Sequence, residues 1–109
     1  MVGVYYDANY GIGYEVEADK ALMSEIDPTW EVWGMYDSLL KLCTDKSISV
    51  IQWGCCYSGI FSYAFVLHKP FENGVDLTGP LEALKAFIEE KGFKTTHDKP
   101  ELVGGVFAC

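Results

Sequence analysis

The chain has 109 residues, which is enough for one domain with its own buried core. Half of the residues are hydrophobic and 15% are aromatic, a composition that excludes a disordered chain. Sixteen acidic residues stand against eight basic ones, all of them lysine, and this absence of arginine argues against direct DNA or RNA binding. We therefore expect a single domain over residues 1–109 with no direct nucleic-acid function.

The negative charge is concentrated in the first third of the chain. Residues 1–37 contain eight carboxylates and one lysine, Lys20. A one-sided negative field attracts basic surfaces and repels phosphate backbones. This asymmetry predicts a basic surface of another protein as the partner.

The first residues carry no recognisable targeting signal. Residues 1–7 lack the basic and apolar segments of a secretion signal, and no apolar run approaches the length of a membrane-spanning helix. We expect a cytoplasmic protein that does not bind a membrane, with a host or a viral genome as its source.

Two strands are predicted at the beginning of the chain. Apolar residues occupy every second position over residues 2–7 and again over residues 12–19, and a turn is expected at residues 8–11. This pattern predicts a hairpin with one face in water. Glu15, Glu17 and Asp19 then form a row on that face, with successive members about 6.5 to 7 Å apart.

One helix is predicted in the next part of the chain. Residues 20–26 fit a short helix or an irregular connection, and we leave the choice open. Asp27 followed by Pro28 is typical of a helix start, and the helix should continue to about Thr44. Trp33 belongs to the broad apolar stripe that we expect to cover a sheet.

The second half of the chain predicts a central hairpin, a second helix and a last strand. Residues 47–53 and 60–68 are rich in β-branched and aromatic residues. Residues 78–80 begin a helix that ends near Gly92, and residues 102–109 alternate again as a strand.

These elements predict the α+β class. The expected order is ββ-α-ββ-α-β, with an antiparallel sheet of about five strands and two helices on one face. Apart from the extra N-terminal strand, this order resembles the ferredoxin-like βαββαβ topology. That topology serves enzymes and binding proteins alike, so the resemblance implies no activity.

The cysteines do not suggest a metal site. They stand at positions 43, 55, 56 and 109, without the paired spacing of structural zinc sites, and no secretion signal favours disulfides. We expect thiols that behave as small hydrophobic side chains, and we predict no metal and no cofactor. A nucleophilic Cys55 or Cys56 would need His68 or His97 as its base, and nothing in the sequence brings these residues together.

The combination of acidic and aromatic residues in the first third is typical of a surface that meets a basic partner. Our leading hypothesis is a small binding protein without enzymatic activity, in which the carboxylates orient the partner and the aromatic rings supply buried area. Such a protein could inhibit an enzyme by occupying a basic groove that normally holds nucleic acid. The candidate partner-binding residues are Tyr5, Tyr10, Glu15, Glu17, Asp19, Trp30 and Glu31.

Two alternatives from other classes stay open. The first is a small-molecule-binding domain or small enzyme, with a pocket between sheet and helices lined by Trp53, Tyr57 and Tyr63. The second is a self-associating structural domain, in which an open sheet forms a two-fold homodimer. The sequence identifies neither the partner nor the ligand, and it does not fix the oligomeric state.

Overall fold

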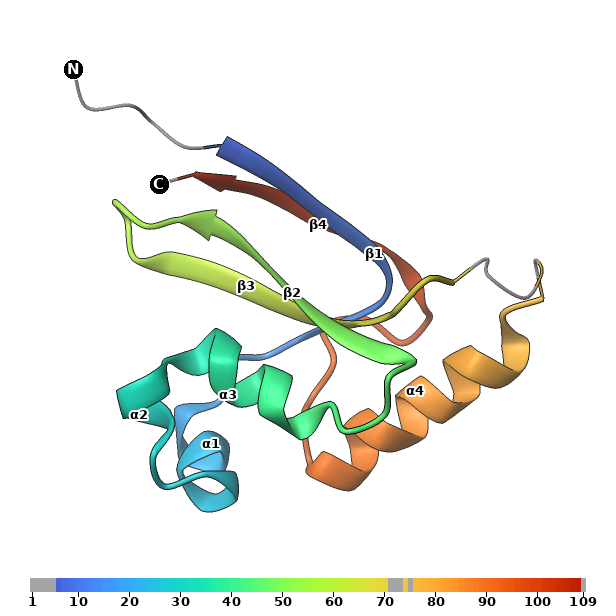
Figure 1. The fold of residues 1–109 in the computed structure, drawn as a ribbon, viewed down its shortest axis with the longest axis horizontal. Helices are drawn as coiled ribbons and strands as arrows, with labels where there is room; N and C mark the ends of the chain where they lie inside the picture. Colours follow the sequence, from blue (N-terminus) through green and yellow to red (C-terminus); the bar gives the residue numbers. More distant parts are fainter. Residues whose placement is uncertain (1–5, 71–73, 75, 109) are drawn as a thin grey trace.

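The computed structural model describes residues 6–70, 74 and 76–108 and confirms the α+β class (Figure 1). Four strands and four helices are found in this part of the chain. In chain order they are β1 (Tyr6–Val16), α1 (Lys20–Ile26), α2 (Trp30–Trp33), α3 (Met35–Leu42), β2 (Ile48–Cys55), β3 (Ile60–Leu67), α4 (Thr78–Lys91) and β4 (Glu101–Ala108). The predicted central hairpin, second helix and last strand are confirmed to within a few residues.

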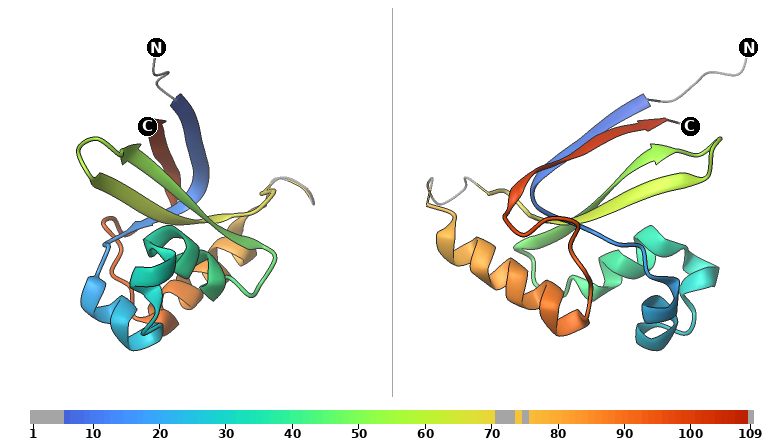
Figure 2. Two further views of the ribbon diagram at one scale, coloured as in Figure 1. Left: turned by 60° about the vertical axis from the view of Figure 1, so that its left-hand side comes forward. Right: turned by 180° about the vertical axis from the view of Figure 1, so that it is seen from behind.

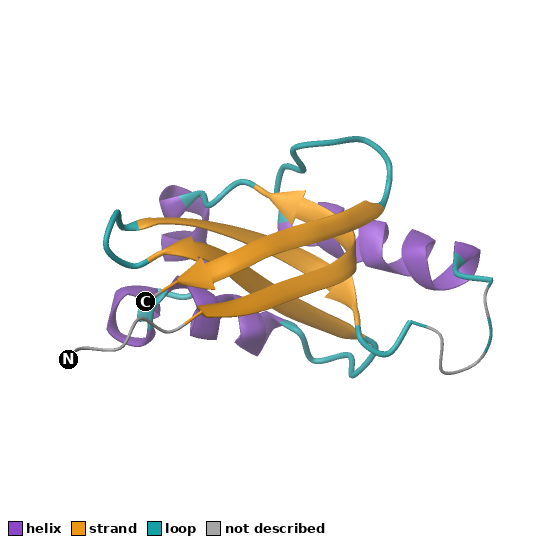
Figure 3. Ribbon diagram, turned by 90° about the horizontal axis from the view of Figure 1, so that it is seen from above, coloured by secondary structure: helices purple, strands orange, loops and turns teal. Residues whose placement is uncertain are grey.

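The four strands form a closed, mixed sheet in the order β1-β3-β2-β4. Three neighbouring pairs are antiparallel, whereas β2 and β4 run parallel and meet over two residue pairs, Gly54 with Phe107 and Cys55 with Ala108. Seen from above, the strands cross over one another as the sheet curls (Figure 3). The prediction of about five antiparallel strands is therefore wrong. The ferredoxin-like arrangement is not confirmed, because it is an open sheet and this one closes.

The predicted N-terminal hairpin is wrong, because the expected turn at residues 8–11 lies inside β1. From Tyr6 to Gly13, β1 pairs with β4, and from Gly13 to Val16 it pairs with β3. A Cβ atom on Gly13 would overlap the carbonyl oxygen of Phe65. Gly11, which suggested the turn, is packed just as closely, since a Cβ atom there would lie 2.8 Å from the Cβ of Val66. Strand pairing therefore outweighs the local turn preference.

The predicted helix up to Thr44 is divided in two at Gly34. This residue has a φ of 91°, a backbone conformation that side chains with a Cβ rarely adopt, and it separates α2 from α3. The undecided segment 20–26 is α1, and the carboxylate of Asp19 caps it by accepting a hydrogen bond of 3.0 Å from the Leu22 N–H.

All four helices lie on the same side of the strands (Figures 1 and 2). The main core lies between the helices and the strands. It contains Phe65 from β3, Leu39 from α3 and Leu84 from α4, none of which is more than 1% exposed. A smaller cluster of Ala64, Val66 and Val103, with Ile51 and Trp53 beside it, lies within the curl of the sheet.

Candidate functional site

The three carboxylates of the predicted acidic row have different environments. Glu15 lies on β1, and its carboxylate accepts a hydrogen bond of 3.2 Å from the Thr96 hydroxyl. Glu17 is exposed beyond the end of β1, and Asp19 caps α1. Because β1 ends at Val16, the row predicted from strand alternation is wrong, although a role of these residues in partner binding stays a prediction.

The remaining predicted partner-binding residues lie in different layers of the fold. Tyr10 lies in the strand layer and is 56% exposed, whereas Trp30 and Glu31 lie in the helical layer (Figure 1). The Trp30 indole N–H donates a 2.9 Å hydrogen bond to the Ser24 hydroxyl, and Trp30 is half-buried. Tyr5 lies outside the described residues.

The helical layer presents an exposed surface that sequence reasoning missed. Val32 is 78% exposed and Trp33 is 55% exposed, although Trp33 was predicted to cover the sheet. The ammonium group of Lys41 lies 4.2 Å from the centre of the Trp33 ring. Asp37 is one turn before Lys41 on α3, so it lies on the same side of that helix. We use the name acidic–aromatic surface for five exposed residues of α2 and α3: Glu31, Val32, Trp33, Asp37 and Lys41.

Gly34 was the signal that could have revealed this surface. A helix that continued through residue 34 would keep Trp33 in register with the apolar stripe of residues 36–43. The positive φ of Gly34 turns the chain at that point and takes Trp33 out of the stripe. The sequence showed the glycine, but it did not show the conformation that the glycine adopts.

The aromatic residues of the alternative pocket prediction are not brought together. Trp53 lies beside Gly105, where a Cβ atom would come within 2.5 Å of the indole. Tyr63 is buried on the helical side, and burial raises the pKa of its hydroxyl. Tyr57 is 70% exposed in the turn between β2 and β3. The three cavities described for this structure are lined by other residues.

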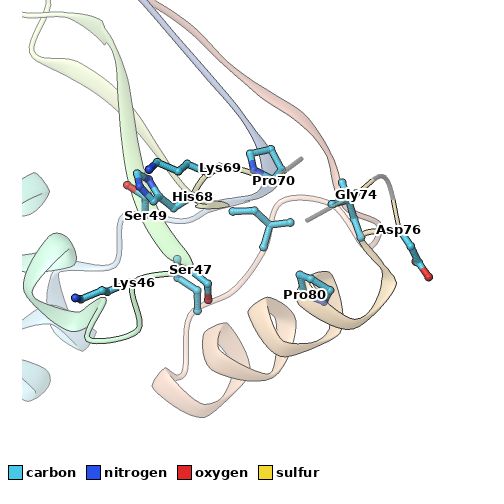
Figure 4. A pocket seen from close by; sticks show the side chains of 12 residues that line it. Lys46, Ser47, Ser49, His68, Lys69, Pro70, Gly74, Asp76 and Pro80 are labelled. Atoms are coloured by element: carbon cyan, nitrogen blue, oxygen red, sulfur yellow. The ribbon is translucent and has the colours of Figure 1, made fainter. Parts of the chain in front are cut away.

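Two of these cavities share one short segment of chain. The larger, of about 650 Å³, lies between β2, β3 and the start of α4 (Figure 4). The smaller, of about 410 Å³, is lined by residues of all four strands and of the segment after β3. Both are lined by Ser49, Leu67, His68, Lys69 and Pro70.

Lys69 adopts an uncommon backbone conformation at this position. Its φ of 52° makes it the one described non-glycine residue with a positive φ. This left-handed conformation turns the chain just after the end of β3, where both cavities begin.

The cysteines have distinct environments, and the expectation of thiols throughout is wrong for Cys56, which is disulfide-bonded. Burial raises the pKa of the Cys43 thiol from 9.0 to about 11. The pKa of Cys55 is lowered, because the backbone N–H groups of Ser58 and Tyr57 stabilise its thiolate. The His97 ring stacks on the Tyr14 ring of β1, with 5.7 Å between the two ring centres.

We expect iodoacetamide at neutral pH to alkylate Cys55 at least about ten times faster than Cys43, because the thiolate is the reactive form. The measurement is mass spectrometry of the two cysteine-containing peptides during the reaction. Equal rates for the two thiols would show that their environments do not differ as described.

Within the described residues, no group of three or more His, Cys, Asp or Glu side chains is arranged to hold a metal ion. No helix in the same part of the chain has the length and apolar character needed to cross a membrane. Comparison with protein-family models, curated proteins and solved structures found no match.

Proposed function

We propose that this domain binds a basic surface of another protein through the acidic–aromatic surface. The observation that carries the proposal is the exposure of Val32 and Trp33, at 78% and 55%, in the part of the chain with the greatest excess of acid. Residues 17–37 contain six carboxylates and one lysine. An exposed tryptophan in a segment rich in carboxylates would combine apolar contact area with charge complementarity to a basic partner.

The two kinds of residue would act on different steps of binding. Glu31 and Asp37 raise the rate of association by attracting a basic partner over a distance set by the salt concentration. Trp33 supplies apolar contact after docking and so slows dissociation. The contact with Lys41 already restrains the indole, which lowers the entropy cost of fixing it against a partner.

This proposal keeps the hypothesis from the sequence but moves its centre from the hairpin to α2 and α3. Glu17 and Asp19 extend the same acidic segment toward α1. An inhibitor that imitates nucleic acid and a cytoplasmic location are narrower proposals from the same charge pattern. If the experiment below finds no such partner, the alternatives are a self-associating structural domain and a small-molecule-binding domain or small enzyme.

The test is capture of a partner from a cognate lysate, followed by binding kinetics with the purified partner. The variants are Trp33→Ala and the pair Glu31→Lys with Asp37→Lys. We expect the charge pair to slow association at least about tenfold at low salt. We expect Trp33→Ala to weaken binding about tenfold or more, mainly through faster dissociation.

A matched control is the pair Glu82→Lys with Glu89→Lys on α4, which makes the same change in net charge on exposed residues away from the surface. This control should bind nearly as well as the wild type. If it loses as much affinity as the pair on α2 and α3, net charge alone governs binding and the proposed surface is wrong.

A further inference from the structure

We infer that the smaller of the two cavities that share Lys69 is a binding site for a small carboxylate with an aromatic or branched apolar body. We call this cavity the β1–β3 groove. Six apolar residues from all four strands contribute to its lining: Tyr10, Ile12, Ile51, Val66, Leu67 and Leu102. This site is separate from the proposed function, because none of its lining residues belongs to the acidic–aromatic surface.

The dimensions of the β1–β3 groove fit a small ligand. Its volume is about 410 Å³, within the usual range of about 300 to 1,000 Å³ for ligand sites. Gly11 also lines it, and a Cβ atom there would lie 2.8 Å from the Cβ of Val66. Val66 thus fills the space that a side chain on Gly11 would need, and the wall of the groove is tightly packed at this point.

The charge of the groove is opposite to that of the protein. Its lining, all of it within the described residues, includes Lys69 and His68 but no Asp or Glu, whereas the whole chain has a net charge of −8. The Ser49 hydroxyl adds a neutral hydrogen-bonding group. An apolar groove with a lysine, a histidine and a serine favours a ligand that joins an apolar body to an anionic group.

The neighbouring larger cavity is lined by the same three polar residues, Ser49, His68 and Lys69. Its charged lining residues also include Lys46 and Asp76, but Figure 4 shows the ends of these two side chains directed away from the cavity centre. Ser49, His68 and Lys69 gather at one side of it. Lys69 lines both cavities, so one residue supplies a positive charge to each.

The experiment is a titration followed by the backbone amide NMR signals of the whole chain, with two probes of the same shape. 2-Naphthoate carries the carboxylate, and 2-naphthamide replaces it with a neutral amide. We expect saturable shifts from naphthoate on residues 10–12, 49–51 and 66–69, with a Kd of about 1 mM or tighter. We expect naphthamide to bind the same residues at least about tenfold more weakly.

A pair of variants isolates the charge of Lys69. Lys69→Asn removes the ammonium group, and asparagine tolerates a positive φ. Lys99→Asn removes one positive charge from an exposed residue outside the groove. We expect the first variant to bind naphthoate at least about tenfold more weakly with naphthamide unchanged, and the second to bind like the wild type.

Three outcomes would overturn the inference. The first is the absence of saturable shifts with naphthoate, and the second is shifts that fall outside the groove. The third is an equal loss of naphthoate affinity in both variants, which would show that net charge acts and not Lys69. The variants of the acidic–aromatic surface should leave naphthoate binding unchanged, so failure of either proposal can be told from failure of the other.

Discussion

Gly13→Ala is expected to lower the free energy of unfolding by about 3 to 5 kcal/mol. The new Cβ atom would overlap the carbonyl oxygen of Phe65 and lie 2.8 Å from the Cα of Val66. Both are backbone atoms of the strand that pairs with Gly13, so neither can turn aside as a side chain could. The substitution must therefore separate β1 from β3 where β1 leaves β4.

Gly79→Ala is the matched control for this prediction. Gly79 lies in the first turn of α4, and a Cβ atom there would have no neighbour within 4 Å. Alanine should raise the free energy of unfolding by about 0.5 to 1 kcal/mol, because it restricts the unfolded chain and favours the helix. Urea unfolding followed by circular dichroism measures both variants. A loss below about 1 kcal/mol for Gly13→Ala would contradict the strand contact described here.

Phe65→Ala should destabilise the domain by about 3 to 5 kcal/mol. Phe65 is fully buried and meets two other rings edge to face, Phe87 at 5.3 Å and Phe93 at 5.4 Å. Its neighbours come from α4 and from the segment after α4, so a cavity at this point could close only by moving several elements together. The loss combines apolar contact, aromatic pairing and an unfilled cavity.

A second phenylalanine gives the comparison. Phe107 stacks on Phe61 at 5.8 Å, but both residues are half-buried. Phe107→Ala should cost about 1 to 2 kcal/mol, because the half-buried Phe107 ring contributes less buried apolar surface to the folded state than the Phe65 ring does. Thermal and urea unfolding of the two variants should give the larger loss for Phe65. Equal losses would mean that the core is not centred on Phe65.

Part of the fold could be predicted from the sequence because its signals are local. The β2–β3 hairpin is dense in β-branched and aromatic residues, and α4 has helical periodicity with a glycine, Gly92, just after its end. Gly92 adopts the left-handed conformation that ends helices. In these segments the local preference and the final structure agree.

The rest of the fold depended on contacts between distant residues. Gly11 carries a turn signal, yet it lies in β1 because β4 pairs with it there. The same applies to the two cavities, whose shared lining joins Ser49 of β2 with Lys69 after β3. No periodicity or spacing in the chain shows that such residues meet.

The acidic–aromatic surface shows an intermediate case. The excess of carboxylates in residues 1–37 could be counted directly, and Glu31 was among the predicted residues. The exposed anchor, Trp33, was assigned to the core because its spacing fits a helix that does not continue through Gly34. The φ angle of Gly34 therefore decides whether Trp33 is buried, as predicted, or exposed, as observed.

The pairing of the first strand with the last has a consequence for how the domain forms. Tyr6 lies opposite Ala108, so this ladder joins residues roughly 100 positions apart in the chain, and bringing such distant strands together is slow. During synthesis, residues 6–12 of β1 cannot pair with β4 until β4 has left the ribosome. Until then their backbone N–H and C=O groups lack the strand partner that they have in the folded protein. In that period the segment can pair with strands of other chains and aggregate, and a chaperone that covers it would reduce this aggregation.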